Sequence, residues 1–139
     1  MRILGIDYGD ARIGLALSDP TATVAGSLGV HKATTMRKDI DYVADIALSR
    51  EVVRIVIGLP LNMDGSEGER ASKTRAFGRN LEKVSDIEVV YQDERLTTVS
   101  AAYALKASGV KKHRQNAHID TASAQIILQA HLEKNKFSI

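Results

Sequence analysis

Three acidic positions, far apart along the chain, have the side chains and the spacing best suited to chemistry. They are Asp7, which ends an apolar run, the adjacent Asp93 and Glu94, which follow another, and Asp120, at the predicted start of the last helix. In an α/β sheet, residues at the carboxyl ends of the strands gather at one edge, where ligands bind. We therefore expect an acidic cluster formed by Asp7, by Asp93 or Glu94, and by Asp120.

Such a cluster would favour a divalent cation. Carboxylates that converge without a cation repel one another and raise one another's pKa values, and a metal ion relieves that repulsion. Ligands that offer only oxygen suit Mg²⁺ or Mn²⁺. Two such ions stabilise the attacking and the leaving oxygens of a phosphodiester displacement. Hydrolysis of a nucleic-acid backbone is therefore the chemistry that these residues would serve best.

Each acid also has a purely structural interpretation. Asp7 could be a hydrogen-bonded turn residue, and an acid at a helix start is favoured by capping and by the helix dipole whatever the function. Either Asp93 or Glu94 could form an ion pair with Arg95. The sequence leaves open which of the two acids pairs with Arg95 and which faces the site.

Other catalytic chemistries find little support in the sequence. Cys is absent, which excludes thiol nucleophiles and zinc–thiolate sites, and no Gly-x-Ser-x-Gly motif suggests a serine hydrolase. The histidines lack a metal-binding spacing and are expected on the surface or in linking segments: His31, His113, His118 and His131.

Two groups of basic residues could hold phosphates. The first belongs to the helix predicted after residues 58–68, and acidic neighbours dilute it: Arg70, Lys73, Arg75, Arg79 and Lys83. Such a helix face is usually solvated. The second group precedes the last helix, beside the predicted acidic edge: Lys111, Lys112, His113 and Arg114. We expect Lys111, Lys112 and Arg114 to contact a nucleic-acid backbone.

A sheet must position these residues, and the hydrophobic spacing predicts its elements. Strands are expected at residues 2–8, 12–18, 24–31, 52–57 and 87–91, and helices at 37–50, 69–84, 98–107 and from 119 onward, after a basic link at 111–118. Three consecutive strands favour antiparallel hairpins, and the later alternation of helices and strands implies parallel pairing. We predict an α/β fold with a mixed five-stranded sheet, antiparallel over its first three strands and parallel thereafter, flanked by helices.

Length and composition agree with one domain. The chain has 139 residues without repeats or linkers, so we expect a single domain spanning residues 1–139. Its net charge of +2 is too small to indicate nucleic-acid binding by itself. Because the chain has no apolar run near the roughly 20 residues of a membrane span and no signal-peptide pattern, we expect a cytoplasmic protein without a membrane partner.

Four blocks of the sequence resemble the YqgF (RuvX) family. They are residues 5–19 (GIDYGDARIGLALSD), 58–68 (GLPLNMDGSEG), 93–98 (DERLTT) and 119–128 (IDTASAQIIL). The first block alone is also similar to the sugar kinase and actin group, whereas the later blocks are specific. The family is described as Holliday junction resolvases and as nucleases that mature the precursor of the small-subunit ribosomal RNA.

The resemblance implies a ribonuclease H-like fold and a metal-dependent endonuclease. It puts the acidic residues of the family on Asp7, Glu94 and Asp120, with Mg²⁺ or Mn²⁺ as cofactor, and suggests that Arg12 and Arg95 help to position phosphates. The substrate it favours is the 5′ end of the 16S rRNA precursor, with ribosomal particles as further partners. Two polar residues near Asp120, Thr121 and Ser123, are expected on the helix surface.

Other functions remain open at this stage. One is a Holliday junction resolvase, which would act on branched DNA as a homodimer, whereas an RNA nuclease could act as a monomer. Another is a non-catalytic RNA-binding factor of ribosome assembly. A third, an ATP-dependent phosphotransferase, is disfavoured because 139 residues supply one of the two domains that such enzymes close around a nucleotide.

Overall fold

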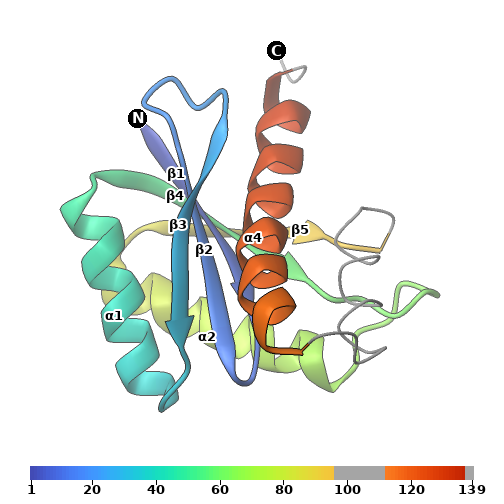
Figure 1. Ribbon diagram of the computed structural model, residues 1–139. Coiled ribbons are helices and arrows are strands. Elements are labelled where there is room, and N and C mark those ends of the chain that lie inside the picture. The colour runs from blue at the N-terminus through green and yellow to red at the C-terminus, as the bar shows by residue number, and fades with distance from the viewer. Residues whose placement is uncertain (96–111, 137–139) are drawn as a thin grey trace.

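The computed structural model shows one sheet with helices packed on both faces (Figure 1). It describes residues 1–95 and the helix at 112–136, with the side chains of that helix described from residue 122 to residue 134. The helix predicted at 98–107 and the basic residue Lys111 lie outside the described residues.

Five strands form the sheet. They are β1 (Arg2–Tyr8), β2 (Arg12–Ser18), β3 (Ala25–Lys32), β4 (Val52–Leu59) and β5 (Glu88–Asp93). Their order across the sheet is β3-β2-β1-β4-β5, with β1, β2 and β3 antiparallel and with β4 parallel to both β1 and β5. The predicted α/β class and the mixed sheet are confirmed. β1 therefore lies at the centre, where both of its faces are covered.

Three helices complete the described structure. They are α1 (Met36–Ser49), α2 (Glu69–Ser85) and α4 (Lys112–Lys136). α1 and α2 cover one face of the sheet and α4 crosses the other (Figure 1). None of the helices in the described part of the chain is both long and apolar enough to span a membrane.

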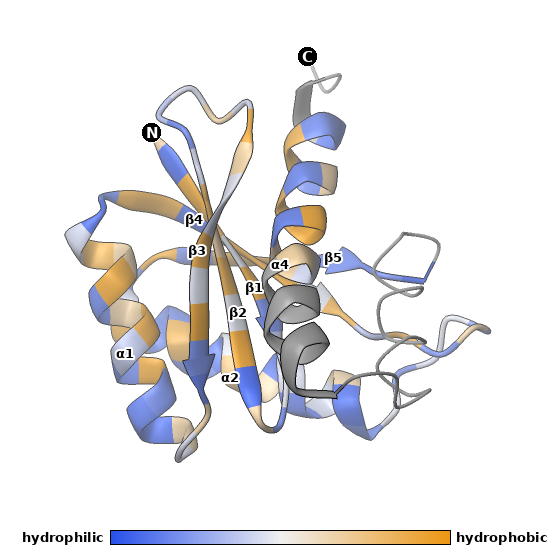
Figure 2. Cartoon of the chain, in the orientation of Figure 1, coloured by the Kyte–Doolittle hydropathy of each residue, from blue (hydrophilic) through white to orange (hydrophobic). Residues whose placement is uncertain are grey.

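The alternation of side chains along β1 divides the apolar core into two layers. Leu4 and Ile6 point toward α1 and α2 and pack in a cluster that includes Phe77. Ile3 points the other way and packs with Leu128 of α4. Figure 2 shows the apolar strands between the apolar sides of the helices. Because successive strand residues face opposite sides, every second residue of β1 meets α4.

α4 approaches the sheet closely because glycine occupies the centre of β1. A Cβ atom on Gly5 would lie 2.6 Å from Leu128 Cβ and 3.1 Å from the carbonyl oxygen of Ala124. Both atoms belong to α4, so a side chain at Gly5 would push the helix away from the strand. This contact sets the distance between α4 and the end of β1.

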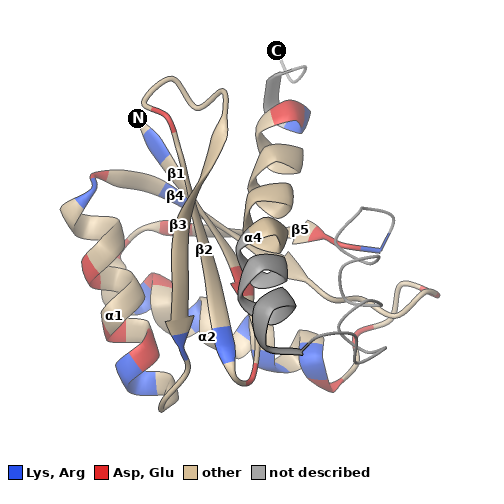
Figure 3. Ribbon diagram, in the orientation of Figure 1, with Lys and Arg blue, Asp and Glu red and all other residues tan. Residues whose placement is uncertain are grey.

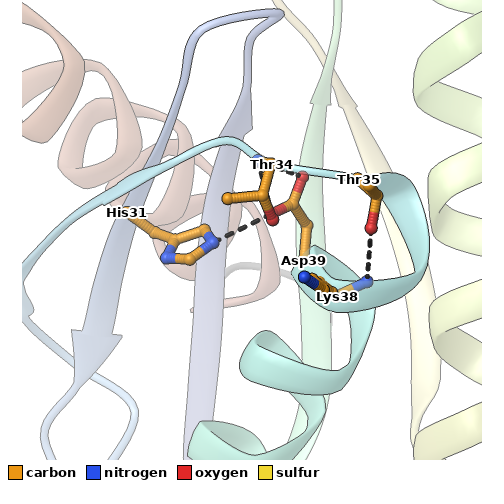
Figure 4. Close-up of polar contacts among 5 residues, drawn as sticks. All are labelled: His31, Thr34, Thr35, Lys38 and Asp39. Carbon is orange, nitrogen blue, oxygen red and sulfur yellow. Dashed lines mark hydrogen bonds and ion pairs between the residues drawn. The ribbon is translucent and has the colours of Figure 1, made fainter.

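A buried polar corner joins β3 to α1. Asp39 is 2% exposed and accepts hydrogen bonds from the Thr34 backbone N–H and hydroxyl, while His31 Nε2 lies 2.9 Å from its Oδ1 (Figure 4). Burial raises the pKa of Asp39, but these hydrogen bonds outweigh it and the pKa is lowered. His31 also stacks on Tyr42, with ring centroids 4.0 Å apart. The corner fastens the edge strand to the first helix.

Three expectations about the last helix are wrong. α4 begins at Lys112, so residues 112–118 are helical rather than a link, and Asp120 lies well inside the helix rather than at its start. These residues lack apolar periodicity, but they contain neither Gly nor Pro, so nothing in them opposes a helix. Ser123, expected on the helix surface, is 0% exposed because α4 packs across several strands.

The Gly5 contact predicts a selective loss of stability. Gly5→Ala should lower the free energy of unfolding by about 1–3 kcal/mol, because its methyl group overpacks the interface with α4. Gly26→Ala in β3 is the matched control, since a Cβ there would meet only the carbonyl oxygen of Leu17, at 3.6 Å. Urea denaturation of both variants checks this, and equal losses would contradict the proposed packing.

Candidate active site

Asp7 is a buried acid at the carboxyl end of β1. It lies two residues beyond Gly5, on the face of the sheet that α4 covers, and is 4% exposed. Its partner on β2 is Gly14, which has no side chain beside the carboxylate. A carboxylate in such surroundings is costly unless hydrogen bonds, opposite charge or a cation compensate it. Asp7 is therefore not an exposed turn residue.

Glu94 lies on the same face of the sheet, over β4, the parallel neighbour of β1. It directly follows β5, its N–H donates to the Leu59 carbonyl oxygen at 3.4 Å, and it is 5% exposed. A Cβ atom on Gly58 of β4 would collide with Glu94 Oε1 and with Ile127 Cδ1 of α4. The Glu94 carboxyl group and the Ile127 side chain thus occupy the space that Gly58 leaves open. Gly58 therefore supports the site by having no side chain.

The two buried acids act on each other. Burial, followed by the negative charge of Asp7, raises the pKa of Glu94 to about 8. The positive charge of Arg70 lowers that pKa in part, and Asp93 raises it slightly. Since desolvation disfavours the charged form and a neighbouring carboxylate does so again, Glu94 retains its proton at neutral pH when no cation is bound.

The structure separates the roles of the two adjacent acids. Asp93 Oδ2 lies 2.8 Å from Arg95 Nη2, and Asp93 also accepts from the Arg95 backbone N–H at 2.9 Å. The hydrogen bond from the Arg95 side chain is the main reason why the pKa of Asp93 is lowered. Asp93 is thus held by Arg95 at the surface, while Glu94 turns inward over Gly58.

Asp120 belongs to α4, and its side chain lies outside the described residues. Its backbone position is one helical turn before Ala124, whose carbonyl oxygen touches the Gly5 position of β1. His118 and His113 lie on the same helix, likewise without described side chains. The role predicted for Asp120 stays a prediction, because only the backbone of this residue is described.

Asp7 and Glu94 are the described residues that could hold a metal ion at this edge. Both offer only oxygen atoms, the ligand type that Mg²⁺ and Mn²⁺ prefer. Within residues 1–95 and the described side chains of α4, no three His, Asp or Glu residues cluster closely enough to bind a metal ion. Asp120, which the sequence predicts as the third acid of this site, lies on α4 without a described side chain.

The predicted phosphate-binding residues that the structure describes lie at the start of β2, just after β5 and at the start of α4. Arg12 begins β2 and is half-buried, and its carbonyl oxygen accepts a hydrogen bond from the Gly9 N–H at 3.0 Å. Arg95 is engaged by Asp93. Lys112 and Arg114 lie in the first turn of α4, without described side chains. The structure adds Arg70, which the sequence placed in a solvated group but whose charge acts on Glu94.

Three polar or hollow features lie away from the acids. A cavity of about 460 Å³ lies at the contact between α1 and α2, on the face opposite Asp7, lined by Met36, Arg37, Ile40, Asp41, Asn80 and Val84. His31 belongs to the β3–α1 corner. His131 is buried in α4, and burial is the main cause that lowers its pKa. The expectation of a surface position is therefore wrong for His131.

The model of the RuvX family, described as Holliday junction resolvase, matches residues 1–134. The chain belongs to the RuvX family. Its membership confirms the resemblance in the four sequence blocks. Since curated relatives in this family are named nucleases, the expected enzyme class, a nuclease acting on phosphodiester bonds, is confirmed as well.

Relatives in the RuvX family are similar over nearly the whole chain. The "Putative pre-16S rRNA nuclease" of Ruminiclostridium cellulolyticum is 40% identical over 135 residues, which are 96% of this chain and 95% of that protein. The protein of the same name from Halothermothrix orenii is 42% identical over 132 residues, covering 95% and 94% of the two chains.

Solved structures of more distant proteins share the fold of this RuvX chain. RuvC of Thermus thermophilus, in complex with a Holliday junction substrate, has a TM-score of 0.62 at 17% identity and covers 99% of this chain and 98% of that one. The Holliday junction resolvase of fowlpox virus has a TM-score of 0.58 at 14% identity, with 97% and 99% covered. These likenesses confirm the predicted ribonuclease H-like fold.

The raised pKa of Glu94 predicts a pH-dependent effect of Glu94→Gln. Between the unfolded pKa near 4.5 and the folded pKa of about 8, the folded protein binds the extra proton, so stability falls as pH rises through this window. The substitution removes that loss, because an amide does not titrate. Without divalent ions, the variant should gain stability relative to the parent protein from about pH 5 to about pH 9, by a few kcal/mol in total.

Denaturation at several pH values measures this difference. Asp93→Asn is the matched control, because the pKa of Asp93 is lowered and its effect on stability changes only in acid. If the Glu94→Gln and parent stabilities ran parallel over this range, Glu94 would not retain its proton in the folded protein.

Proposed function

We propose that this RuvX chain is a metal-dependent endonuclease in which Asp7, Glu94 and Asp120 hold the metal and form the catalytic centre. The observation that carries the proposal is the convergence of two buried carboxyl groups, Asp7 and Glu94, at the carboxyl ends of neighbouring strands. Burial of two mutually repelling acids is unfavourable in the empty protein and becomes favourable when a divalent cation neutralises them.

The residues present suit a hard divalent cation. Asp7 and Glu94 supply carboxylate oxygens on one face of the sheet, and Asp120 would add a third from α4. A bound Mg²⁺ or Mn²⁺ would activate water and stabilise the charge that develops on the leaving oxygen. Glu94 must give up its proton to act as a ligand, so metal binding and deprotonation of Glu94 are coupled.

The walls of the site would orient the substrate. α4 covers the acids from one side, which keeps their surroundings poor in water and strengthens their attraction for a cation. Arg12 and Arg95 would contact phosphates beside the scissile bond, and Lys111, Lys112 and Arg114 would contact the backbone further along the strand. Such contacts position the substrate without reading its sequence.

The substrate that we propose is the 16S rRNA precursor, cut at the 5′ end that the resemblance implies. Proteins about 40% identical over nearly the whole chain carry the name of a pre-16S rRNA nuclease. Such an enzyme would act in the cytoplasm on ribosomal particles or on free precursor RNA. We expect it to work as a monomer or as a homodimer.

A Holliday junction resolvase is the second candidate. The description of the RuvX family and the shared fold of RuvC favour it. The same acids would hydrolyse DNA phosphodiesters, and a two-fold symmetric homodimer would be needed to cut paired strands. A non-catalytic RNA-binding assembly factor is the remaining alternative, and it would use the acids only for structure.

Cleavage assays test the proposed centre. With Mg²⁺ or Mn²⁺, the parent protein should cut a 16S rRNA precursor, and Asp7→Asn and Glu94→Gln should each lower the rate roughly 100-fold or more, because transition-state stabilisation worth several kcal/mol is lost. Asp93→Asn, next to Glu94 but held by Arg95, should retain cleavage. A four-way DNA junction is assayed in parallel to separate the two substrates.

Each result of that assay has a direct meaning. Cleavage of the junction alone would favour the resolvase, and metal-independent RNA binding without cleavage of either substrate would favour the assembly factor. Metal-dependent cleavage that survived both Asp7→Asn and Glu94→Gln would contradict the proposed catalytic centre.

Metal binding can be measured without activity. At pH near 8, Mg²⁺ at about ten times its dissociation constant should stabilise the parent protein by about 1.4 kcal/mol, because the ion binds the folded state. Thermal unfolding with and without Mg²⁺ reports this gain. The gain should vanish in Asp7→Asn and in Glu94→Gln but persist in Asp93→Asn. An equal gain in all four proteins would mean that the ion binds elsewhere.

A further inference from the structure

A small basic notch borders the end of β1, on the side opposite α4. It is lined by Tyr8, Asp10, Arg70, Lys73 and Thr74. Tyr8 directly follows the buried Asp7, and Asp10 belongs to the turn between β1 and β2. The notch therefore adjoins the same edge of the sheet as the two buried acids.

The geometry of α2 explains why its basic residues face this edge. Arg70, Lys73, Thr74 and Phe77 follow one another at helical spacing and lie on one face of the helix. Phe77 stacks on Tyr8, with ring centroids 4.4 Å apart, and so fixes this face against the end of β1. Figure 3 shows the basic segments of α2 near the turn between β1 and β2.

In the notch, Lys73 forms an ion pair with Asp10 that another anion could replace. Its Nζ lies 3.1 Å from Asp10 Oδ1, and the two side chains are 53% and 77% exposed. An ion pair this exposed contributes little to stability. A carboxylate oxygen and a phosphate oxygen make similar hydrogen bonds to an ammonium group, so a phosphate can take the place of Asp10.

Arg70 connects the notch to the acids. It shares the notch with Lys73, and its charge also acts on the Glu94 carboxyl group. By contrast, Arg75, further along α2, pairs with Glu67 at 2.7 Å and lies over the ring of Tyr91. Arg70 and Lys73 are therefore basic residues of α2 that lie near the edge of the sheet where Asp7 and Glu94 are buried.

We propose that the notch is a phosphate-binding subsite for the nucleic-acid strand, in which Arg70 and Lys73 hold a backbone phosphate next to the scissile one and Asp10 occupies the subsite until the strand binds. The inference rests on the proposed nuclease function and adds the residues that place the strand. Because Asp10 of the β1–β2 turn lines the notch, a strand held there would cross that turn. Thr74 is buried and its hydroxyl donates to the Arg70 carbonyl oxygen at 2.8 Å, which helps to fix the wall of the subsite.

Binding measurements on a cleavage-deficient protein test the subsite. All variants carry Asp7→Asn, and binding of a fluorescein-labelled RNA spanning the 5′ end of the 16S sequence in its precursor is followed by anisotropy with Mg²⁺ present. Lys73→Gln should weaken binding about five- to tenfold at about 0.1 M salt and lower the slope of log K against log salt by about one. Arg70→Gln should have a similar effect.

Lys83→Gln is the matched control, because it removes one positive charge from the exposed far end of α2. It should change binding less than about twofold. Asp10→Asn should tighten binding, because the competing carboxylate is gone, and this gain should disappear when Lys73→Gln is also present. A gain of this kind does not arise from damage to the fold.

The outcomes separate this inference from the function on which it rests. If the Asp7→Asn protein binds RNA and Lys73→Gln and Arg70→Gln behave like Lys83→Gln, the subsite is wrong while the nuclease proposal stands. If the parent protein neither binds nor cuts the RNA or a four-way DNA junction, the proposed function fails, and the subsite fails with it.

Discussion

The central constraint in this protein is the burial of two neighbouring carboxyl groups under one helix. Asp7 and Glu94 are each about 5% exposed or less, and the charge of one raises the pKa of the other. In the absence of a cation, this arrangement is tolerated because Glu94 keeps a proton. A cation bound between Asp7 and Glu94 would remove this unfavourable interaction, so the fold favours positive charge beside the two acids.

Glycine makes the constraint geometrically possible. Gly5 lets α4 approach the centre of β1, and Gly58 leaves the space that the Glu94 carboxyl group and Ile127 share. Both glycines lie on the α4 side of adjacent parallel strands. The packing of α4 is therefore inseparable from the position of the acids, so the stability of the helix–sheet contact and the geometry of the site depend on the same residues.

The rim of the site differs from its interior in how charge is balanced. Near the surface, Asp93 pairs with Arg95, and Asp10 pairs with Lys73. These pairs are solvated and exchangeable. The interior acids are buried on the face that α4 covers, where a charge is costly unless a proton or a cation neutralises it. At the rim, Arg95 and Lys73 could exchange their carboxylate partners for a phosphate. In the interior, Asp7 and Glu94 are suited to a metal ion.

The sequence by itself determined the strands of the sheet and indicated the candidate acids, because strand patterns and strand ends can be recognised from neighbouring residues. Alternating and β-branched runs fixed the strands, and apolar runs that end in Asp7 or Asp93–Glu94 marked strand ends. Only the tertiary structure decided that Glu94 turns inward while Asp93 meets Arg95, and that Ser123 is buried. Neighbouring residues with similar side chains are distinguished by what packs against them, and that depends on elements distant in the sequence.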